Sequence, residues 1–334
     1  MFSLKKEKIM KYKIFIICIL TGLFLPLLAL VSCNSEPEKT EGVKLGAKSN
    51  ANTLTPKPGP RKHDPPKPGK TDPLKPDNPG GGAAGNSSGG AAGNSGSGAA
   101  NQQDEAAKQH IVNHLTALIV PSIKDNINIY NSITWNEAAE AYDISGANQL
   151  FDVIEYDNAQ SQKTKYNGND DESKTTRREM YLGFGYNKNY IKAFGALANK
   201  IAATKNVQMK TELENMVKKI REYGTAYHLT AFNTLINKKD KLLKLDLSDL
   251  QILKARFDAI HPTEITILFT FKDTIYSDYE LNIEVGTAKH TLQDNATAEE
   301  IQKYLKDKFT SVEPDFAKVI EEAPKIAGIL NKIQ

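Results

Sequence analysis

Apolar residues recur every three or four positions through most of the chain after residue 104, which is the spacing of one face of an α-helix. The clearest stripe belongs to one long helix, and its members step by four and three along the sequence. They are Met209, Leu213, Met216, Ile220, Tyr223 and Tyr227. Lys218, Lys219 and Arg221 lie off this stripe, so the pattern predicts an amphipathic helix with one buried face.

The same spacing predicts further helices on both sides of this one. An N-terminal stripe of Ile111, Leu115, Leu118 and Ile119 ends at Pro121. Shorter helices are predicted around Ile123, Ile127 and Tyr130, at Leu150–Tyr156 and at Thr175–Phe184. Asn187–Ala203 carries one face of Tyr190, Phe194, Leu197 and Ile201, and Gly195 beside this face would allow close packing.

Helix start and stop signals divide the rest of the chain. Ser248-Asp249-Leu250-Gln251 and Thr297-Ala298-Glu299-Glu300 both fit the capping-box pattern that begins a helix. Pro262 is expected to break or kink the first of these helices. Apolar positions from Ile301 to Leu330 predict one or two C-terminal helices, interrupted by Pro314 and Pro324. The polar segment from Lys163 to Lys174 is predicted to be an exposed loop.

One segment conflicts with this helical pattern. Ile265 to Phe271 is β-branched and aromatic, so local propensity favours a strand there. The periodicities of the other segments predict an all-α domain, a helical bundle of about six to eight helices over residues 104–334.

The N-terminal residues follow a different pattern. Basic residues precede an apolar run from Ile14 to Val31, and Leu30-Val31-Ser32 stands directly before Cys33. This order is that of a bacterial lipoprotein signal peptide, which is cut before a cysteine that carries the lipid. We therefore expect residues 1–32 to be removed and Cys33 to be lipidated. Translation from Met10 instead of Met1 would give a more compact signal, so the true start codon stays open.

Residues 33–103 are predicted to be a disordered tether between the lipidated Cys33 and the domain. Ten of the fifteen prolines lie between Pro37 and Pro79, and Gly-Gly-Ala-Ala-Gly-Asn-Ser occurs at 81–87 and again at 89–95. The stretch from Asn34 to Gln103 has no Phe, Tyr or Trp, so it cannot bury enough apolar area to offset the entropy of ordering. A spacer that lifts the domain off the membrane is the favoured role, and docking of the Pro-rich phrases into an aromatic groove is the alternative.

Charge and cysteine content limit the function of residues 104–334. The whole chain has a net charge of +3, but residues 104–334 hold 29 basic and 33 acidic side chains. That balance argues against nucleic-acid binding, which needs a basic surface to displace counterions. Cys18 and Cys33 are the two cysteines of the sequence, so residues 104–334 contain neither a disulfide nor thiol chemistry.

No pattern in the sequence predicts an enzyme, a metal site or a cofactor. His110 and His114 have the spacing of two metal ligands on one helix, but further ligands are lacking and two exposed polar residues are the favoured interpretation. His228 is expected to be packed or exposed rather than catalytic. Gly183-Phe184-Gly185 lacks the third glycine of a dinucleotide loop. Lys238-Lys239-Asp240-Lys241 could attract an acidic partner, although a solvated helix end is the simpler interpretation.

Several phrases in fixed order resemble a known protein family. They are Arg177-Arg178-Glu179-Met180-Tyr181, Tyr186 with Ile191 and Gly195, Lys238-Lys239-Asp240-Lys241-Leu242, Leu245-Asp246-Leu247-Ser248-Asp249-Leu250, and a C-terminal segment from Glu313-Pro314 to Ile329-Leu330-Asn331-Lys332-Ile333. Together they resemble the paralogous surface lipoproteins of Borrelia spirochaetes that include the complement regulator-acquiring surface protein CspA. The resemblance covers about 175–334 and is weaker from 104.

The resemblance implies an all-helical bundle with a long C-terminal helix, and it favours helix over strand at Ile265 to Phe271. It also implies anchoring to the outer membrane by lipid alone, with the domain exposed on the cell surface. The implied partners are host complement regulators of the factor H type or terminal complement components. The alternatives are plasminogen or matrix binding through lysines such as Lys238, Lys239 and Lys241, or a structural envelope protein without a host ligand. No partner-binding residue is assigned, and a homodimer built on the C-terminal helix remains an open expectation because Pro314 and Pro324 lie in that segment.

Overall fold

The structure is a computed structural model that describes residues 96–334, with side chains from Gln102 onward. The predicted signal peptide, Cys33 and most of the predicted tether lie outside the described residues. The first described helix, α2 (Gly96–Ala117), begins within the range predicted as tether. Among the described residues no helix is long and apolar enough to cross a membrane.

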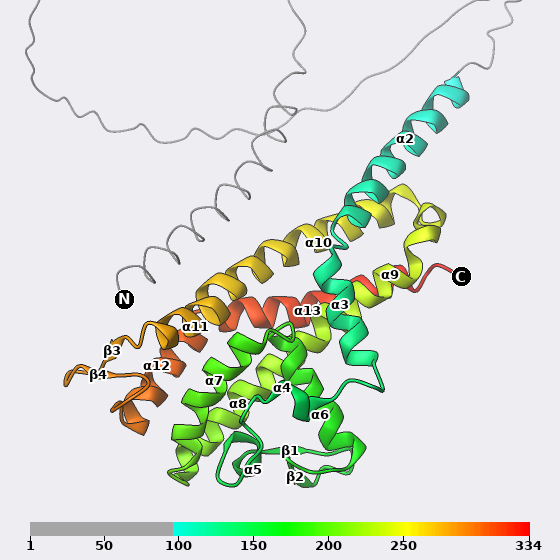
Figure 1. The fold of residues 1–334 in the computed structure, drawn as a ribbon. Coiled ribbons are helices and arrows are strands. Elements are labelled where there is room, and N and C mark those ends of the chain that lie inside the picture. The colour runs from blue at the N-terminus through cyan, green and yellow to red at the C-terminus, as the bar shows by residue number, and fades with distance from the viewer. Residues whose placement is uncertain (1–95) are drawn as a thin grey trace, which may run out of the picture. The chain divides into compact units, whose positions relative to one another are not determined.

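The described residues are mostly helical, which confirms the predicted all-α fold. The other α-helices are α3 (Pro121–Asn131), α4 (Glu137–Glu140), α5 (Leu150–Val153), α6 (Asp171–Gly183), α7 (Lys188–Ala202), α8 (Val207–Gly224), α9 (Thr234–Lys238), α10 (Leu247–Ile267), α11 (Asp273–Glu280), α12 (Ala298–Thr310) and α13 (Glu313–Leu330). Two π-helical segments, η1 (Thr225–Asn233) and η3 (Leu268–Lys272), and a 3₁₀ segment, η2 (Lys239–Lys244), connect some of them without a loop. Figure 1 shows α10 and α13 lying beside each other, with α2 against the N-terminal end of α10.

The predicted apolar face of α8 is confirmed. All six residues of the stripe, from Met209 to Tyr227, are buried, and the stripe continues from α8 into η1. Helix α6 packs closely against α8 where two glycines meet. A Cβ on Gly183 would lie 2.5 Å from the Ile220 carbonyl oxygen, and one on Gly224 would lie 2.5 Å from the Gly183 nitrogen. The absence of side chains at both positions is therefore what allows these two helices to approach.

The prediction of a strand at Ile265 to Phe271, made from local propensity, is wrong. Helix α10 continues to Ile267 and passes into η3, and both Ile267 and Phe271 are buried against other helices. Burial in a helical core outweighs local β-propensity, which mostly measures the fit of a side chain to a half-buried surface. The helix also does not end at Pro262, which lies inside α10.

The residues from Ile301 to Leu330 form two helices, α12 and α13, which is one of the two predicted outcomes, but the prolines do not interrupt α13 itself. Pro314 lies in the first turn of α13, where a missing N–H breaks no helical hydrogen bond. Pro324 lies inside α13, and the helix continues through it to Leu330. Phe316, Val319 and Ile326 on either side of it are fully buried, so packing of this apolar face offsets the lost hydrogen bond.

Two short antiparallel hairpins interrupt the helical pattern. β1 (Glu155–Asp157) pairs with β2 (Lys163–Lys165), and β3 (Glu284–Val285) pairs with β4 (His290–Thr291). The helix expected at Leu150–Tyr156 therefore stops at Val153. The loop expected at Lys163 to Lys174 contains β2, the buried Tyr166 and the start of α6.

The two predicted helix starts differ in outcome. Thr297 caps α12 as expected, and its capping box with Glu300 is complete. The cap of α10 is Asp246 rather than Ser248, because the Asp246 carboxylate accepts a hydrogen bond from the Asp249 backbone N–H. The helix thus begins at Leu247, and its cap lies two residues before the first residue of the predicted box.

Candidate partner-binding cleft

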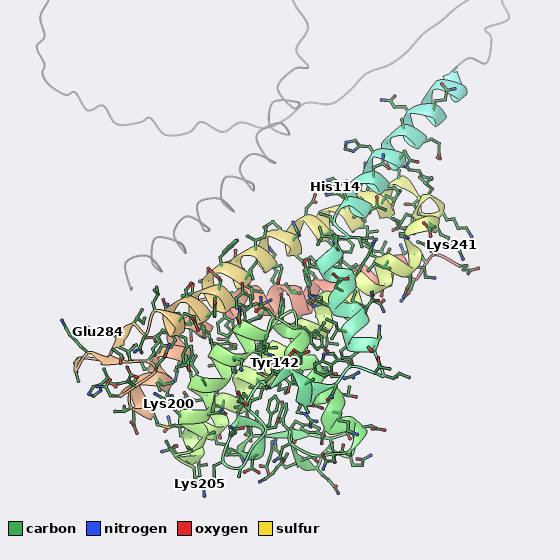
Figure 2. The ribbon with its side chains drawn as sticks, viewed as in Figure 1. His114, Tyr142, Lys200, Lys205, Lys241 and Glu284 are labelled. Carbon is green, nitrogen blue, oxygen red and sulfur yellow. The ribbon has the colours of Figure 1, made fainter. Side chains whose placement is uncertain are left out.

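The histidines singled out in the sequence are not brought together. His110 is exposed, whereas His114 pairs with Asp258 of α10 across 2.7 Å, and Figure 2 shows His114 where α2 meets α10. Within residues 96–334 no group of three or more His, Cys, Asp or Glu side chains is placed to hold a metal ion. His114 therefore ties α2 to α10, and it is half-buried, whereas the sequence interpretation expected both histidines to be exposed.

His228 is packed in the interior. Its two ring nitrogens lie 3.2 Å from the Gly224 carbonyl oxygen and 3.2 Å from the side-chain nitrogen of Asn126. Burial, together with the positive charge of Lys272, lowers the pKa of His228 to about 3. The imidazole is therefore neutral at physiological pH and links η1 to α3.

Some lysines at the end of α9 are held by hydrogen bonds within the domain, and others are exposed. Lys238 donates a 2.7 Å hydrogen bond to the Ile333 carbonyl oxygen and so holds the C-terminal residues, as Lys244 does at Gln334. Lys241 is exposed, and Figure 2 shows its side chain at the edge of the domain. A partner that needs free lysines would thus meet fewer of them than the sequence suggested.

A cleft of about 710 Å³ lies between the β1–β2 hairpin, α6, α8, η1 and α13. Its charged wall includes Glu155, Glu179, Glu214, Lys218 and Arg221. Ala226 of η1 and Ile320 and Pro324 of α13 add apolar lining. No local motif marks this site, because its lining residues range from Glu155 in β1 to Pro324 in α13.

Arg221 is fixed at the centre of the charged wall. Its guanidinium donates to the Glu179 carboxylate at 2.6 and 3.1 Å and to the Tyr166 hydroxyl at 3.0 Å. It also lies over the rings of Tyr156 and Tyr166, 5.6 and 5.4 Å from their centroids. Burial lowers the pKa of Arg221, but Tyr166 and Glu179 outweigh this effect and leave the pKa above its ordinary value. The prediction that Arg221 lies off the apolar face of α8 holds, yet the residue is not a free surface charge.

Lys210 holds the hairpin against α8 at the rim of this cleft. Its ammonium group lies 2.6 Å from the Glu155 carboxylate and 3.6 Å from that of Glu214. Glu214 also accepts a 2.9 Å hydrogen bond from the Glu155 backbone N–H. The hydrogen bond to Glu155 is the main reason that the pKa of Lys210 is raised. The charged wall is consequently cross-linked and preformed before any partner binds.

This arrangement suits the binding of a partner. An anchored Arg with neighbouring aromatic rings is typical of protein interfaces. The apolar residues of α13 would receive an apolar side chain, and the fixed charges of the charged wall would select its neighbours. The cleft is therefore a candidate site for a segment of a protein partner.

Comparison with known proteins gives a family match and structural similarities. Residues 131–331 match the family model described as Borrelia Bbcrasp-1 domain containing protein. A C-terminal proteolytic fragment of an outer surface protein from Borrelia burgdorferi is similar over 66% of this chain and 99% of that one, with 12% identity and a TM-score of 0.47. The outer surface protein BBA66 of the same organism gives the same coverages and identity with a TM-score of 0.48. Its outer surface lipoprotein BBA64 is 16% identical over 70% of this chain and all of that one, with a TM-score of 0.44. None of the curated proteins compared with the chain matches it.

Proposed function

Because this chain belongs to the Borrelia family defined by the Bbcrasp-1 domain, we propose that it is an outer-surface lipoprotein that binds host serum proteins. Complement regulators or complement components are the partners we expect, and evasion of complement is the expected role. The observation that carries the proposal is the family match, which spans residues 131–331 and so contains every residue of the cleft described above.

The N-terminal sequence supports the surface location. Cys33 follows an apolar run and Leu30-Val31-Ser32, as a lipid attachment site requires. The Pro- and Gly-rich segment after it, which we propose is a tether, would hold the domain away from the bilayer. A lipid-anchored domain on such a tether is well placed to reach soluble host proteins.

Two other functions remain as alternatives. The first is plasminogen or matrix binding, which Lys241 and its neighbours at the end of α9 would serve. A lysine analogue should then compete for the partner. The second is a structural envelope lipoprotein that has no host ligand, for which crosslinking on intact cells should return bacterial partners alone.

A serum capture tests the proposal. The whole chain is immobilised through its N-terminal end, and the proteins retained from serum are identified and titrated. Saturable retention of a complement regulator or component is the expected result. Retention of plasminogen without complement proteins would favour the first alternative, and an empty capture from serum of every host tested would count against host binding altogether.

A matched pair of charge reversals tests the cleft. Lys218→Glu changes the charged wall, whereas Lys303→Glu changes α12, outside the cleft; both lysines are exposed and both lie four residues before a carboxylate partner. We expect the Lys218 variant to bind the captured partner at least several-fold more weakly and the Lys303 variant to bind it unchanged. Equal binding by both variants would place the partner elsewhere on the domain.

A further inference from the structure

Helix α13 carries a proline on the side that lines the cleft. Ile320 and Pro324 lie one helical turn apart, both line the cleft, and Pro324 is exposed. Because a proline has no backbone N–H, the helical hydrogen bond from position 324 to the Ile320 carbonyl oxygen cannot form. The apolar lining from α13 therefore contains a backbone acceptor that the helix itself leaves unpaired.

No other group of the domain replaces the missing N–H. Among the described residues, neither a side chain nor a backbone N–H from outside the helix donates to the Ile320 carbonyl oxygen. A proline ring inside a helix also crowds the carbonyl four residues before it. A carbonyl that stays dry and unpaired is costly, so this oxygen needs either water or a donor from a bound partner.

The charged side chains of the cleft, in contrast, already have partners of opposite sign within the domain. They form a set of ion pairs along the wall and its rim. The pairs are Arg221 with Glu179, Lys163 with Asp157, Lys218 with Glu222, and Lys210 with both Glu155 and Glu214. These charges shape the field that a partner meets, but they do not supply the unpaired hydrogen-bonding groups.

The unpaired groups are uncharged. Asn215 of α8 is exposed, and Thr225 and Thr230 of η1 are half-buried. Within residues 96–334 none of these three side chains makes a hydrogen bond. A side-chain amide and a hydroxyl can each donate to a carbonyl oxygen. The cleft thus offers donors from α8 and η1 and one backbone acceptor from α13.

We propose that the Ile320 carbonyl oxygen accepts a backbone N–H from the partner, and that the bound part of the partner is an extended segment. The inference rests on the proposed function, since the partner is the serum protein expected there. An extended segment has N–H and C=O groups along its whole length, whereas a helix has already paired most of its own. Its carbonyl groups would meet the Asn215 amide and a hydroxyl of η1, and an apolar side chain would pack on Pro324.

A helix bound in the cleft fits these observations less well. Recognition of a helix in a groove depends on apolar side chains at three- and four-residue spacing that enter an apolar groove. Charged and polar residues make up most of the lining here. A helical segment would also bring no backbone N–H from its interior to the Ile320 oxygen.

Restoring the N–H at position 324 tests the proposal. Pro324→Leu keeps an apolar side chain in the cleft but lets α13 close its own hydrogen bond to Ile320, so the helix gains stability and the acceptor is lost to the partner. We expect a higher midpoint of urea denaturation together with a Kd about two- to tenfold higher for the protein that the original whole chain captures from serum. A variant that is more stable and binds that protein unchanged would overturn the proposal.

Two further variants separate the carbonyl from other effects. Pro262→Leu is the matched control, because Pro262 is an exposed proline inside α10 that does not line the cleft. It should gain stability in the same way and bind unchanged; an equal loss of binding would overturn the assignment. Pro324→Ala should weaken binding as Pro324→Leu does. Weakening by only one of them would assign the effect to the size of the side chain and not to the Ile320 carbonyl.

Hydrogen exchange of the captured protein tests the extended segment. We expect a segment that is not helical in the free protein to become protected on binding, with less protection when the Pro324→Leu chain is bound. Protection of a helix instead would overturn the proposal. Capture of no serum protein would overturn it together with the proposed function, whereas normal capture by both Pro324 variants would overturn this inference alone.

Discussion

The Lys272 ammonium group lies 3.1 Å from the Glu264 carboxylate inside the helical core, where the lysine side chain is only 4% exposed. Lys272 ends the π-helical segment η3, and it also contacts Tyr223, whose hydroxyl lies 3.2 Å away. Burial raises the pKa of Glu264 although Lys272 opposes the shift. The second Glu264 oxygen has no partner among the described residues, so this ion pair is poorly compensated.

Removing one member of this pair should destabilise the domain strongly. Glu264→Gln keeps the shape of the side chain but leaves the Lys272 ammonium group buried without a counter-charge. We expect a loss of about 3–5 kcal/mol in the free energy of unfolding, measured by urea denaturation. The double variant Glu264→Leu with Lys272→Met should recover most of that loss, because it removes both charges. A double variant as unstable as the single one would show that the pair itself stabilises the fold.

His228 should make the stability of the domain depend on pH. Its pKa is about 3 in the folded protein and about 6.5 when unfolded, so between these values the unfolded chain binds more protons. Stability is therefore fully present above pH 6.5 and falls as the pH drops toward 3, by up to about 1.4 kcal/mol per pH unit from this residue. Glu264 acts in the opposite direction, because its pKa is raised: its contribution to stability decreases as the pH rises above its ordinary value of 4.5.

His228→Gln tests this dependence, because an amide can still bond to Asn126 and to the Gly224 carbonyl but does not titrate. Thermal unfolding should be followed from pH 7 to pH 5 in the variant and in the original chain, because Glu264 is present in both and its contribution cancels in the comparison. We expect a shallower decline of the free energy of unfolding in the variant than in the original chain. Identical slopes would mean that other groups carry the pH dependence.

Two glycine substitutions should change stability in opposite directions. Gly183→Ala would place a Cβ 2.5 Å from a backbone oxygen of α8, so α6 and α8 would have to move apart at a cost of about 1–3 kcal/mol. Gly328→Ala lies in α13 with no atom within 4 Å of the added Cβ, and it should stabilise the domain by about 0.5–1 kcal/mol. Urea denaturation of the two variants checks both signs. Equal changes in the free energy of unfolding would mean that α6 and α8 can adjust to the added methyl group.

Features that depend on helical periodicity were predictable from the sequence. The α8 face, the Thr297 cap and close packing at Gly195 all follow from local spacing, and the structure confirms them. The neighbour packed against Gly195, Ile144, is known only from the structure. These features depend only on residues three or four positions apart, or on one small residue beside an apolar stripe.

The buried charges were not predictable in this way. In the sequence, Arg177 and Arg221 look like surface residues, because the carboxylates that pair with them come from other parts of the fold. Lys272 pairs with Glu264, eight positions earlier, and this spacing is not one that a regular α-helix brings together. The Ile265 to Phe271 segment failed for a related reason: only contacts with distant helices decide that it is helical. The charged cleft likewise joins segments far apart in the sequence, so no local motif marks it.

Lipid attachment at Cys33 is the prediction on which the surface location depends. Cys33→Ala removes the thiol that would carry the diacylglycerol, and without it the acyl chains that bind the bilayer cannot be attached. We expect the variant to lose incorporation of labelled palmitate, to leave the detergent phase and to disappear from the surface of intact cells. Cys18→Ala is the matched control, since it changes the other cysteine, within the apolar run, and should leave all three readouts unchanged. A Cys33 variant that still partitions into detergent and stays on the surface would show that another segment anchors the protein, and the proposal of a lipid-tethered binding domain would then fail at its first step.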